Sequence, residues 1–242
     1  MKGKFKIDSV LIQNGQFAFA EQIPGRRQLL QVSFSRLSGY LTHISDMHYV
    51  WEMYPLQAVL TGRFMKRAPF HLRFVFPMRV KRDTFSFQGS LGGPASLKIF
   101  NPAVFPASGL KFTGGVLDGL TFSGSANSHY AVGTMTMLYH DMTFEAMKKK
   151  DTSRTNKFVS WGVNSFVRRN NPRKGKEKEA KSVALFFRRD VEKGFGNFFW
   201  KTLFSGMKAT LIPSVNTMNL KNIQAVSPDT KEAKAQGKKT GR

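Results

Sequence analysis

The sequence predicts a mainly β fold with C-terminal α-helices: an antiparallel, twisted or curved sheet that is capped by amphipathic helices. Through most of residues 1–150, apolar residues alternate with polar ones, which is the period of a strand with one buried face. Gly, Pro, Asn and Asp interrupt this alternation at intervals typical of antiparallel meanders. After residue 150 the period becomes helical, so the helices are expected at the C-terminal end.

The alternation predicts the strands one by one. Strands are expected at residues 10–21, 29–41, 56–64, 70–76, 84–91, 109–126 and 132–147, with a helical turn at 101–106. Within the first strand, Asn14-Gly15 predicts a type I′ hairpin turn. The apolar face of the later strands carries Phe70, Leu72, Phe74, Phe76, Phe85, Phe87, Phe112 and Phe122. Periodicity alone leaves open whether this face is an ordinary core or the lining of a lipid-binding groove.

The remainder of the chain divides into a cap and a tail. An amphipathic helix is expected at 156–169, followed by a charged loop, a return strand at 182–187 and a second helix at 195–211. The lysine-rich end, which also contains Gly and Pro, has the composition of a disordered segment. We therefore expect an antiparallel β domain at 1–150, which the resemblance described below implies is a β-groove domain, a helix–strand–helix cap at 151–212 and a disordered basic tail at 213–242.

The helix predicted at 195–211 has a wide aromatic face. On a helix, one stripe holds Phe195, Phe199, Trp200, Leu203, Met207 and Leu211, and the opposite side holds Asn197, Lys201, Ser205 and Lys208. Gly196 and Gly206 weaken its intrinsic stability, so the helix needs a surface to pack against. That surface is either an open apolar sheet face or a membrane interface. In the second case, membrane contact is expected at Phe198, Phe199, Trp200, Lys201, Phe204 and Lys208.

The charge of the chain is strongly basic and uneven. The net charge is +23; residues 1–147 hold 15 basic and 8 acidic residues, a net +7, and residues 148–242 hold 23 and 7, a net +16. Such an excess implies an acidic partner surface or solubility maintained by repulsion. The basic run at 168–181 contains no aromatic side chain that could stack on a base. A nucleic-acid-binding β protein is therefore the weaker alternative, and a scaffold that docks on an acidic partner is a third.

The sequence contains no recognisable catalytic or metal-binding constellation. The absence of cysteine excludes disulfides, thiolate ligands and thiol nucleophiles. No phosphate-binding loop or nucleophile elbow occurs, and His43, Asp46 and His48 lack a further partner for a metal site. We expect a non-enzymatic protein without catalytic residues, metal, cofactor or small-molecule substrate.

The segment 186–211, FFRRDVEKGFGNFFWKTLFSGMKATL, resembles the C-terminal signature of AsmA-like envelope proteins. The matching positions are Arg189, Asp190, Phe195, Asn197, Trp200, Lys201, Ser205, Gly206, Lys208 and Thr210. Segments at 4–21, 101–142 and 165–172 resemble the same family in the same order, so the resemblance covers about residues 3–211. Within the signature, Arg189 and Asp190 are expected to form an ion pair or to cap the following helix, where a negative charge is favoured.

The resemblance implies a β-groove related to TamB and the bridge-like lipid transfer proteins, a half-pipe whose apolar concave face shields acyl chains. It implies that the protein holds or guides phospholipid between the inner and outer membrane, or supports outer-membrane biogenesis. The implied partners are phospholipid and a membrane surface, with outer-membrane or other envelope proteins beside them. Lipid contact is then expected at the eight apolar strand residues named above.

The implied location is the periplasm or cell envelope, in association with the inner membrane. The chain shows neither a signal peptide nor a transmembrane helix, and it lacks the N-terminal anchor and most of the groove that the family has. We therefore expect it to be the C-terminal portion of a larger protein or a truncated product.

Overall fold

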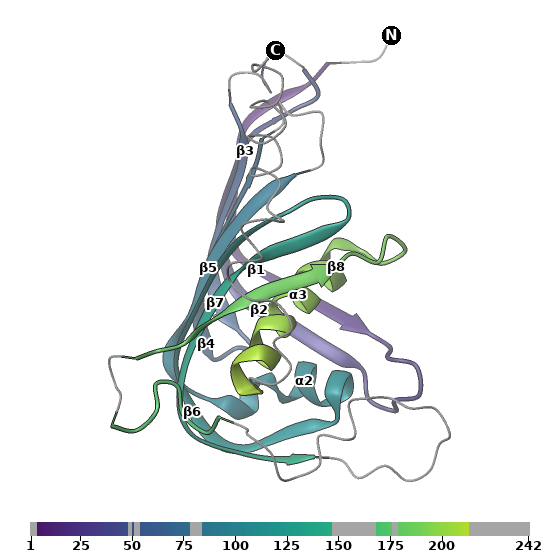
Figure 1. Ribbon diagram of the computed structural model, residues 1–242. Helices are drawn as coiled ribbons and strands as arrows, with labels where there is room; N and C mark the ends of the chain where they lie inside the picture. The colour runs from purple at the N-terminus through teal and green to yellow at the C-terminus, as the bar shows by residue number, and fades with distance from the viewer. Residues whose placement is uncertain are drawn as a thin grey trace, which may run out of the picture.

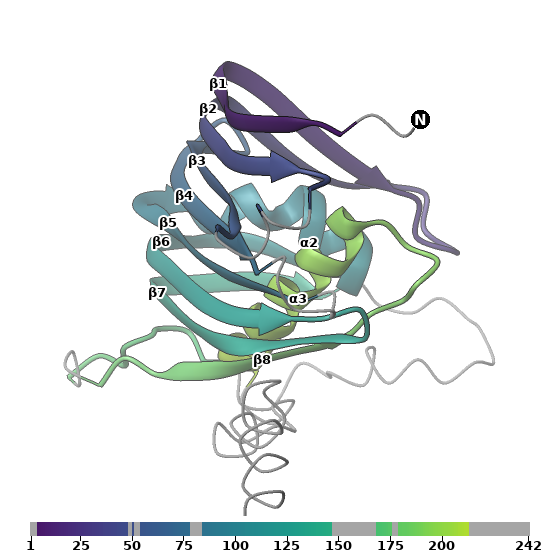
Figure 2. The same ribbon diagram turned by 90° about the horizontal axis from the view of Figure 1, so that it is seen from above.

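The computed structural model describes residues 4–47, 50, 54–77, 84–146, 168–175 and 179–212. Eight antiparallel strands form one sheet, in which each strand pairs with its neighbours in the sequence. The strands are β1 (Lys6–Glu21), β2 (Leu30–Ser45), β3 (Leu56–Phe64), β4 (Ala68–Phe76), β5 (Phe85–Ser96), β6 (Leu110–Ala126), β7 (Tyr130–Ala146) and β8 (Ser182–Arg188). The sheet is open and curved, with β1 and β8 at its two edges (Figures 1 and 2).

Helices cover the concave side of this sheet. The 3-10 helix η1 (Leu97–Phe100) and helix α2 (Asn101–Ser108) interrupt the meander between β5 and β6, and α3 (Phe195–Leu211) follows β8. Figure 2 shows α2 and α3 on the same side of the sheet. The predicted fold class is confirmed, and the bounds of α3 are those predicted for the second helix. None of the helices in the described part of the chain is long and apolar enough to cross a membrane.

The strand alternation in the sequence explains which side is covered. In β4, Phe70, Leu72 and Phe74 are buried on the concave face, whereas Pro69 and His71 are exposed on the other face. The turn into β4 is tight because Met65 and Lys66 both adopt positive φ, 49° and 61°, as a type I′ turn requires. This turn sets the β3–β4 register, in which Leu60 lies opposite Leu72.

The predicted hairpin turn at Asn14-Gly15 is wrong. Asn14 does adopt a left-handed conformation, with φ of 51°, but β1 continues through it. The pairing of β1 with β2 shifts register between Ile12 and Gly15 and then resumes, which is the signature of a β-bulge. The left-handed residue bends the strand instead of reversing it, because β2 supplies pairing partners on both sides of the bulge.

The sheet extends across the domain boundary that the sequence predicts at residue 150. The sequence assigns β8 to the cap, but β8 pairs with β7, from Thr136 opposite Ser182 to Tyr130 opposite Arg188. Helix α3 packs on this end of the sheet. The helix predicted at 156–169 falls almost entirely outside the described residues, and the tail predicted at 213–242 falls wholly outside them.

Candidate functional site

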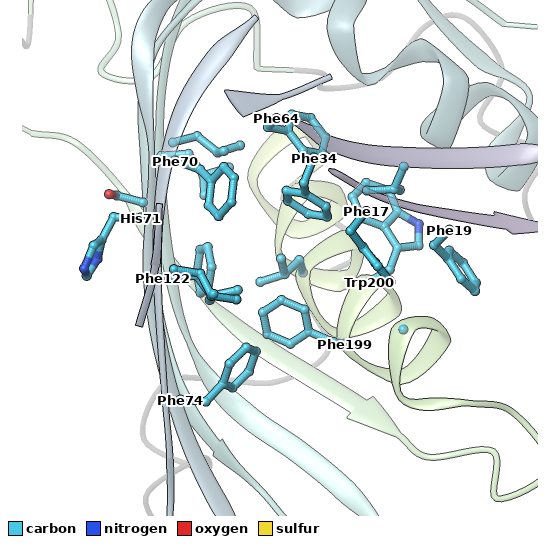
Figure 3. Close-up of a pocket in the computed structure, with 18 of the residues that line it drawn as sticks. Phe17, Phe19, Phe34, Phe64, Phe70, His71, Phe74, Phe122, Phe199 and Trp200 are labelled. Carbon is cyan, nitrogen blue, oxygen red and sulfur yellow. The ribbon is translucent and has the colours of Figure 1, made fainter. Parts of the chain in front are cut away.

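An apolar cavity of about 520 Å³ lies between the concave face of the sheet and α3 (Figure 3). Its volume is within the range of small-molecule sites, about 300–1,000 Å³. The apolar lining consists of Phe17, Phe19, Val32, Phe34, Leu37, Leu60, Phe64, Phe70, Leu72, Phe74, Leu91, Phe100, Leu120, Phe122, Met135, Phe195, Gly196, Phe199, Trp200, Leu203 and Met207. His71 and Ser90 also border it, but the His71 ring points to the opposite face of the sheet (Figure 3).

Two glycines make room for the aromatic rings of the cavity wall. A Cβ at Gly62 would lie 2.8 Å from Cε1 of Phe70, and a Cβ at Gly89 would lie 2.5 Å from Cζ of Phe122. Each ring therefore occupies the space above a glycine on the neighbouring strand, where any other residue would displace it. The wall is thus shaped by the pairing of glycine with phenylalanine across strands.

Helix α3 closes the cavity with Phe199. Its ring centroid lies 5.1 Å from that of Phe74, 5.6 Å from Phe87 and 6.1 Å from Phe122, each in an edge-to-face arrangement. Such aromatic pairs stabilise by about 0.5–1.5 kcal/mol each beyond the burial of their area. The ring of Phe195, one turn earlier, is stacked parallel to Phe199. These contacts hold the N-terminal half of α3 over the sheet.

Polar side chains fasten α3 at both edges of the sheet. At the end of β1, Nδ2 of Asn197 donates to Oε2 of Glu21 at 2.6 Å, and Nζ of Lys201 lies 3.9 Å from Oε1 of the same carboxylate. On β8, the backbone N–H of Phe186 donates to Oγ of Ser205 at 3.1 Å, which satisfies a donor on the edge strand. Asn197, predicted on the polar side of the helix, is only 2% exposed because it faces this tether.

Four of the eight residues predicted to contact lipid line the cavity: Phe70, Leu72, Phe74 and Phe122. The other four do not. Phe76 packs on Phe85, with ring centroids 5.2 Å apart, Phe85 packs on Phe87, and Phe112 lies against Phe100. These four belong to the apolar core around the cavity, because the apolar face of the sheet is longer than the space that α3 leaves open.

The side chains predicted to contact a membrane face the protein instead. Phe198, Trp200 and Phe204 are buried, and Phe199, Lys201 and Lys208 are half-buried. Burial lowers the pKa of the Lys208 ammonium group, which lies 5.3 Å from the ring centre of Phe204. In this arrangement the aromatic face of α3 meets the sheet of its own chain, as the sheet-capping alternative predicts. Membrane contact stays a prediction, and it would require α3 to leave the sheet.

The expected cap by Asp190 is not formed. Gly194 is the N-cap residue of α3, and no side chain caps the helix. Oδ1 of Asp190 accepts from the backbone N–H of Glu192 at 3.2 Å, within the turn before the helix. The guanidinium of Arg189 lies 5.6 Å from the ring centre of Phe198, so its visible contact is with an aromatic face.

Most of the cavity wall was not predicted from the sequence. The wall from β1 to β3 includes Phe17, Phe19, Phe34 and Phe64, none of which was among the predicted site residues. The signal was present, because Phe17 and Phe19 alternate with polar or small residues as clearly as the residues of β4 do. The alternation does not record where α3 lies. The position of α3 decides which part of the apolar face is left open.

The described residues form no cluster of three or more potential metal ligands. A scan against protein-family models, a search of curated proteins and a search of solved structures each found no match to this chain.

Proposed function

We propose that this protein binds an acyl chain of a lipid in the cavity under α3, without catalysing a reaction. The observation that carries the proposal is the cavity itself, about 520 Å³ in volume, with an almost wholly apolar and aromatic lining. A methylene group fills about as much liquid volume as a water molecule, about 30 Å³. The cavity therefore has room for one chain of ordinary length, with any headgroup outside.

The resemblance to AsmA-like proteins supports the further proposal that this binding serves the handling of phospholipid at the cell envelope. Eight strands at a spacing of about 4.8 Å extend over only about 35 Å, which is too short to connect two membranes. The proposed role of the described part is accordingly to hold or guide a lipid, in contact with membranes or envelope proteins. The burial of the aromatic face of α3 favours binding inside the protein over direct insertion of this helix.

Native mass spectrometry of the gently purified protein tests the proposal. The variant Leu60→Trp/Leu72→Trp fills the middle of the cavity from two residues that face each other on β3 and β4. The matched control is Val59→Trp/Arg73→Trp, the neighbouring cross-strand pair on the opposite face. We expect co-purified lipid on the wild type and the control, and little on the cavity variant, with circular dichroism showing that all three are folded.

Two results would count against the proposal. Equal lipid occupancy in the cavity variant and the wild type would mean that the lipid binds elsewhere on the protein. A lipid-free wild type that binds polynucleotide at low salt, with affinity falling steeply as salt rises, would instead favour the nucleic-acid alternative.

A further inference from the structure

The cavity under α3 comes nearest to solvent beside β1 and the first turn of the helix. Of its apolar lining residues, only Phe17 on β1 and Phe195 on α3 are exposed, at 52% and 45%. The others are buried or half-buried. In Figure 3, Phe17 lies on the side of the cavity opposite Phe74 and Phe122. The exposed lining residues therefore mark the place where a ligand has the shortest path into the cavity.

At this place α3 meets β1 through a few contacts. A Cβ at Gly196 would lie 3.2 Å from Cδ2 of Phe19, so glycine lets the helix approach the ring on β1. One residue further, Nδ2 of Asn197 donates to Oε2 of Glu21, and Nζ of Lys201 lies 3.9 Å from Oε1 of the same carboxylate. We call the group of Glu21, Asn197 and Lys201 the tether.

On the side of β8 the same helix is held by close packing. The ring of Phe198 lies 6.3 Å from that of Phe187, between centroids, and 5.6 Å from the guanidinium of Arg189. Further along the helix, Gly206 lies directly against Leu185, with no space for a Cβ between them. These apolar contacts lose their stabilisation when they separate, because water does not replace them. The β8 side is therefore suited to act as a hinge.

The tether is the weaker of the two attachments. A separation of 3.9 Å is at the limit of an ion pair, and Lys201 is only half-buried, so water screens the attraction. Oδ1 of Asn197 is buried without a hydrogen-bond partner in the described part of the chain, and opening would give it water. No side chain caps the start of the helix either. Segments held in this way are those that open locally.

We propose that the acyl chain enters the cavity between β1 and α3, by a local opening that breaks the tether and keeps the packing on β8. This inference rests on the proposed function and adds the route into its site. In the closed state the tether holds the aromatic face of α3 over the chain. In the open state Phe17 and Phe195 form the two apolar sides of the entrance, as in lids that close over a ligand.

A reversible bridge across the entrance tests this route. The chain contains no cysteine, so Glu21→Cys/Asn197→Cys places its only two thiols on either side of the entrance. A short bis-thiosulfonate reagent then links β1 to α3, and a reductant removes the link. The probe is cis-parinaric acid, a fatty acid whose fluorescence rises in an apolar site. In stopped-flow experiments the bridge should slow its entry by about tenfold or more, and reduction should restore the rate.

The matched control is Phe186→Cys/Ser205→Cys, which places two thiols where β8 meets α3. The same reagent then fixes the helix on the side that stays closed, so the probe should enter as fast as before bridging. Mass spectrometry of both proteins shows whether the bridge has formed.

Glu21→Ala provides a second measurement without a bridge. It removes both contacts of the tether and should release bound cis-parinaric acid about tenfold faster than the wild type, as expected for the loss of a hydrogen bond to a charged group. Asp8→Ala is the control on the same strand. Asp8 forms an exposed ion pair with Lys6, and its loss should leave the release rate unchanged.

The outcomes separate this inference from the proposed function. Unchanged entry into the bridged Glu21→Cys/Asn197→Cys protein would place the entrance elsewhere and overturn the inference, while the acyl-chain site would stand. Equal slowing by the two bridges would also overturn it, because the whole helix would then have to leave the sheet. Release from Glu21→Ala at the wild-type rate would show that the tether does not close the entrance. No rise in fluorescence with the wild type would overturn both proposals.

Discussion

Asn171 shows how one buried polar side chain can fix the approach to an edge strand. It is 1% exposed, and its Nδ2 donates to the carbonyls of Met137 at 2.7 Å and Lys181 at 3.1 Å. Its Oδ1 accepts from the backbone N–H of Lys181 at 2.9 Å. The side chain therefore satisfies backbone groups of β7 and of the residue before β8, which would otherwise lack partners.

Asn171→Ala should lower the free energy of unfolding by about 2–4 kcal/mol, because it leaves several buried backbone groups unpaired. Urea denaturation would measure the loss. Asn170→Ala is the matched control: its Oδ1 accepts an exposed hydrogen bond from the backbone N–H of Asp141, and it should cost less than about 1 kcal/mol. Equal effects at the two positions would contradict the bridging role of Asn171.

His140 and Asp118 form an exposed pair whose strength depends on pH. Nδ1 of His140 lies 2.9 Å from Oδ2 of Asp118, and this hydrogen bond raises the pKa of His140 above its ordinary value. The stabilisation from a raised pKa is complete below the unfolded pKa and is lost as the pH rises through the folded one. Both side chains are largely accessible, so the effect on stability should be small.

We expect an NMR titration of the His140 ring to give a raised pKa in the wild type and a lower one in Asp118→Asn. An unchanged His140 titration in the variant would mean that Asp118 is not the cause of the shift.

At the scale of elements, the close packing of α3 on the sheet explains why the helix contains Gly206, which lowers its intrinsic stability. A Cβ at Gly206 would lie 2.3 Å from Cδ2 of Leu185 on β8 and 2.9 Å from Sδ of Met135 on β7. Leu185, the nearer of the two, is fully buried and has little room to move. Glycine lets α3 approach the sheet closely at this point, so close packing offsets the loss of helix propensity.

Gly206→Ala should destabilise the protein even though alanine is the better helix former. The gain in propensity is about 1 kcal/mol, whereas overpacking a core contact costs about 1–3 kcal/mol, so we expect a net loss of about 1 kcal/mol. Gly194→Ser is the control, since a Cβ there would meet nothing within 4 Å and serine suits an N-cap. A higher melting temperature for Gly206→Ala would show that the contact is looser than described.

At the scale of the whole molecule, the two edges of the sheet differ. β8 is covered by α3 through the bond from Phe186 to Ser205, whereas β1 pairs only with β2 in the described part of the chain. The β1 edge exposes large apolar side chains at Phe5, Ile7, Val10, Leu11 and Phe17. An open edge with exposed apolar residues favours pairing with other chains, and the net charge of +23 opposes it.

We expect the protein to associate more strongly as salt screens this charge, and Leu11→Lys to suppress the association. Leu11 is 67% exposed, so the change should leave the melting temperature nearly unaltered. Sedimentation velocity at low and high salt measures the effect. Val191→Lys, at a residue 73% exposed and far from β1 in the sequence, is the charge-matched control. Equal suppression by both variants would attribute the effect to net charge alone.

Much of the fold could be predicted because its signals are local. The strand alternation of β4 and the bounds of α3 both follow from the spacing of apolar residues within one segment. Asn14 shows the limit of such signals: its left-handed conformation was predictable, but a bulge and a hairpin share it, and the pairing with β2 decides between them. The β8 strand was likewise predicted from its own sequence, whereas its membership of the sheet depends on β7.

The sequence by itself determined an antiparallel sheet with one apolar face and an aromatic helix that needs a surface to cover. The folded chain decided which surface that is, and which part of the apolar face is left open as a cavity. Phe74 and Phe87 are equivalent in pattern, yet only the first lines the cavity, because α3 lies where Glu21 holds Asn197 across 176 residues of chain. Contacts between such distant segments depend on how all the strands between them pair. The spacing of apolar residues within one segment does not determine that pairing.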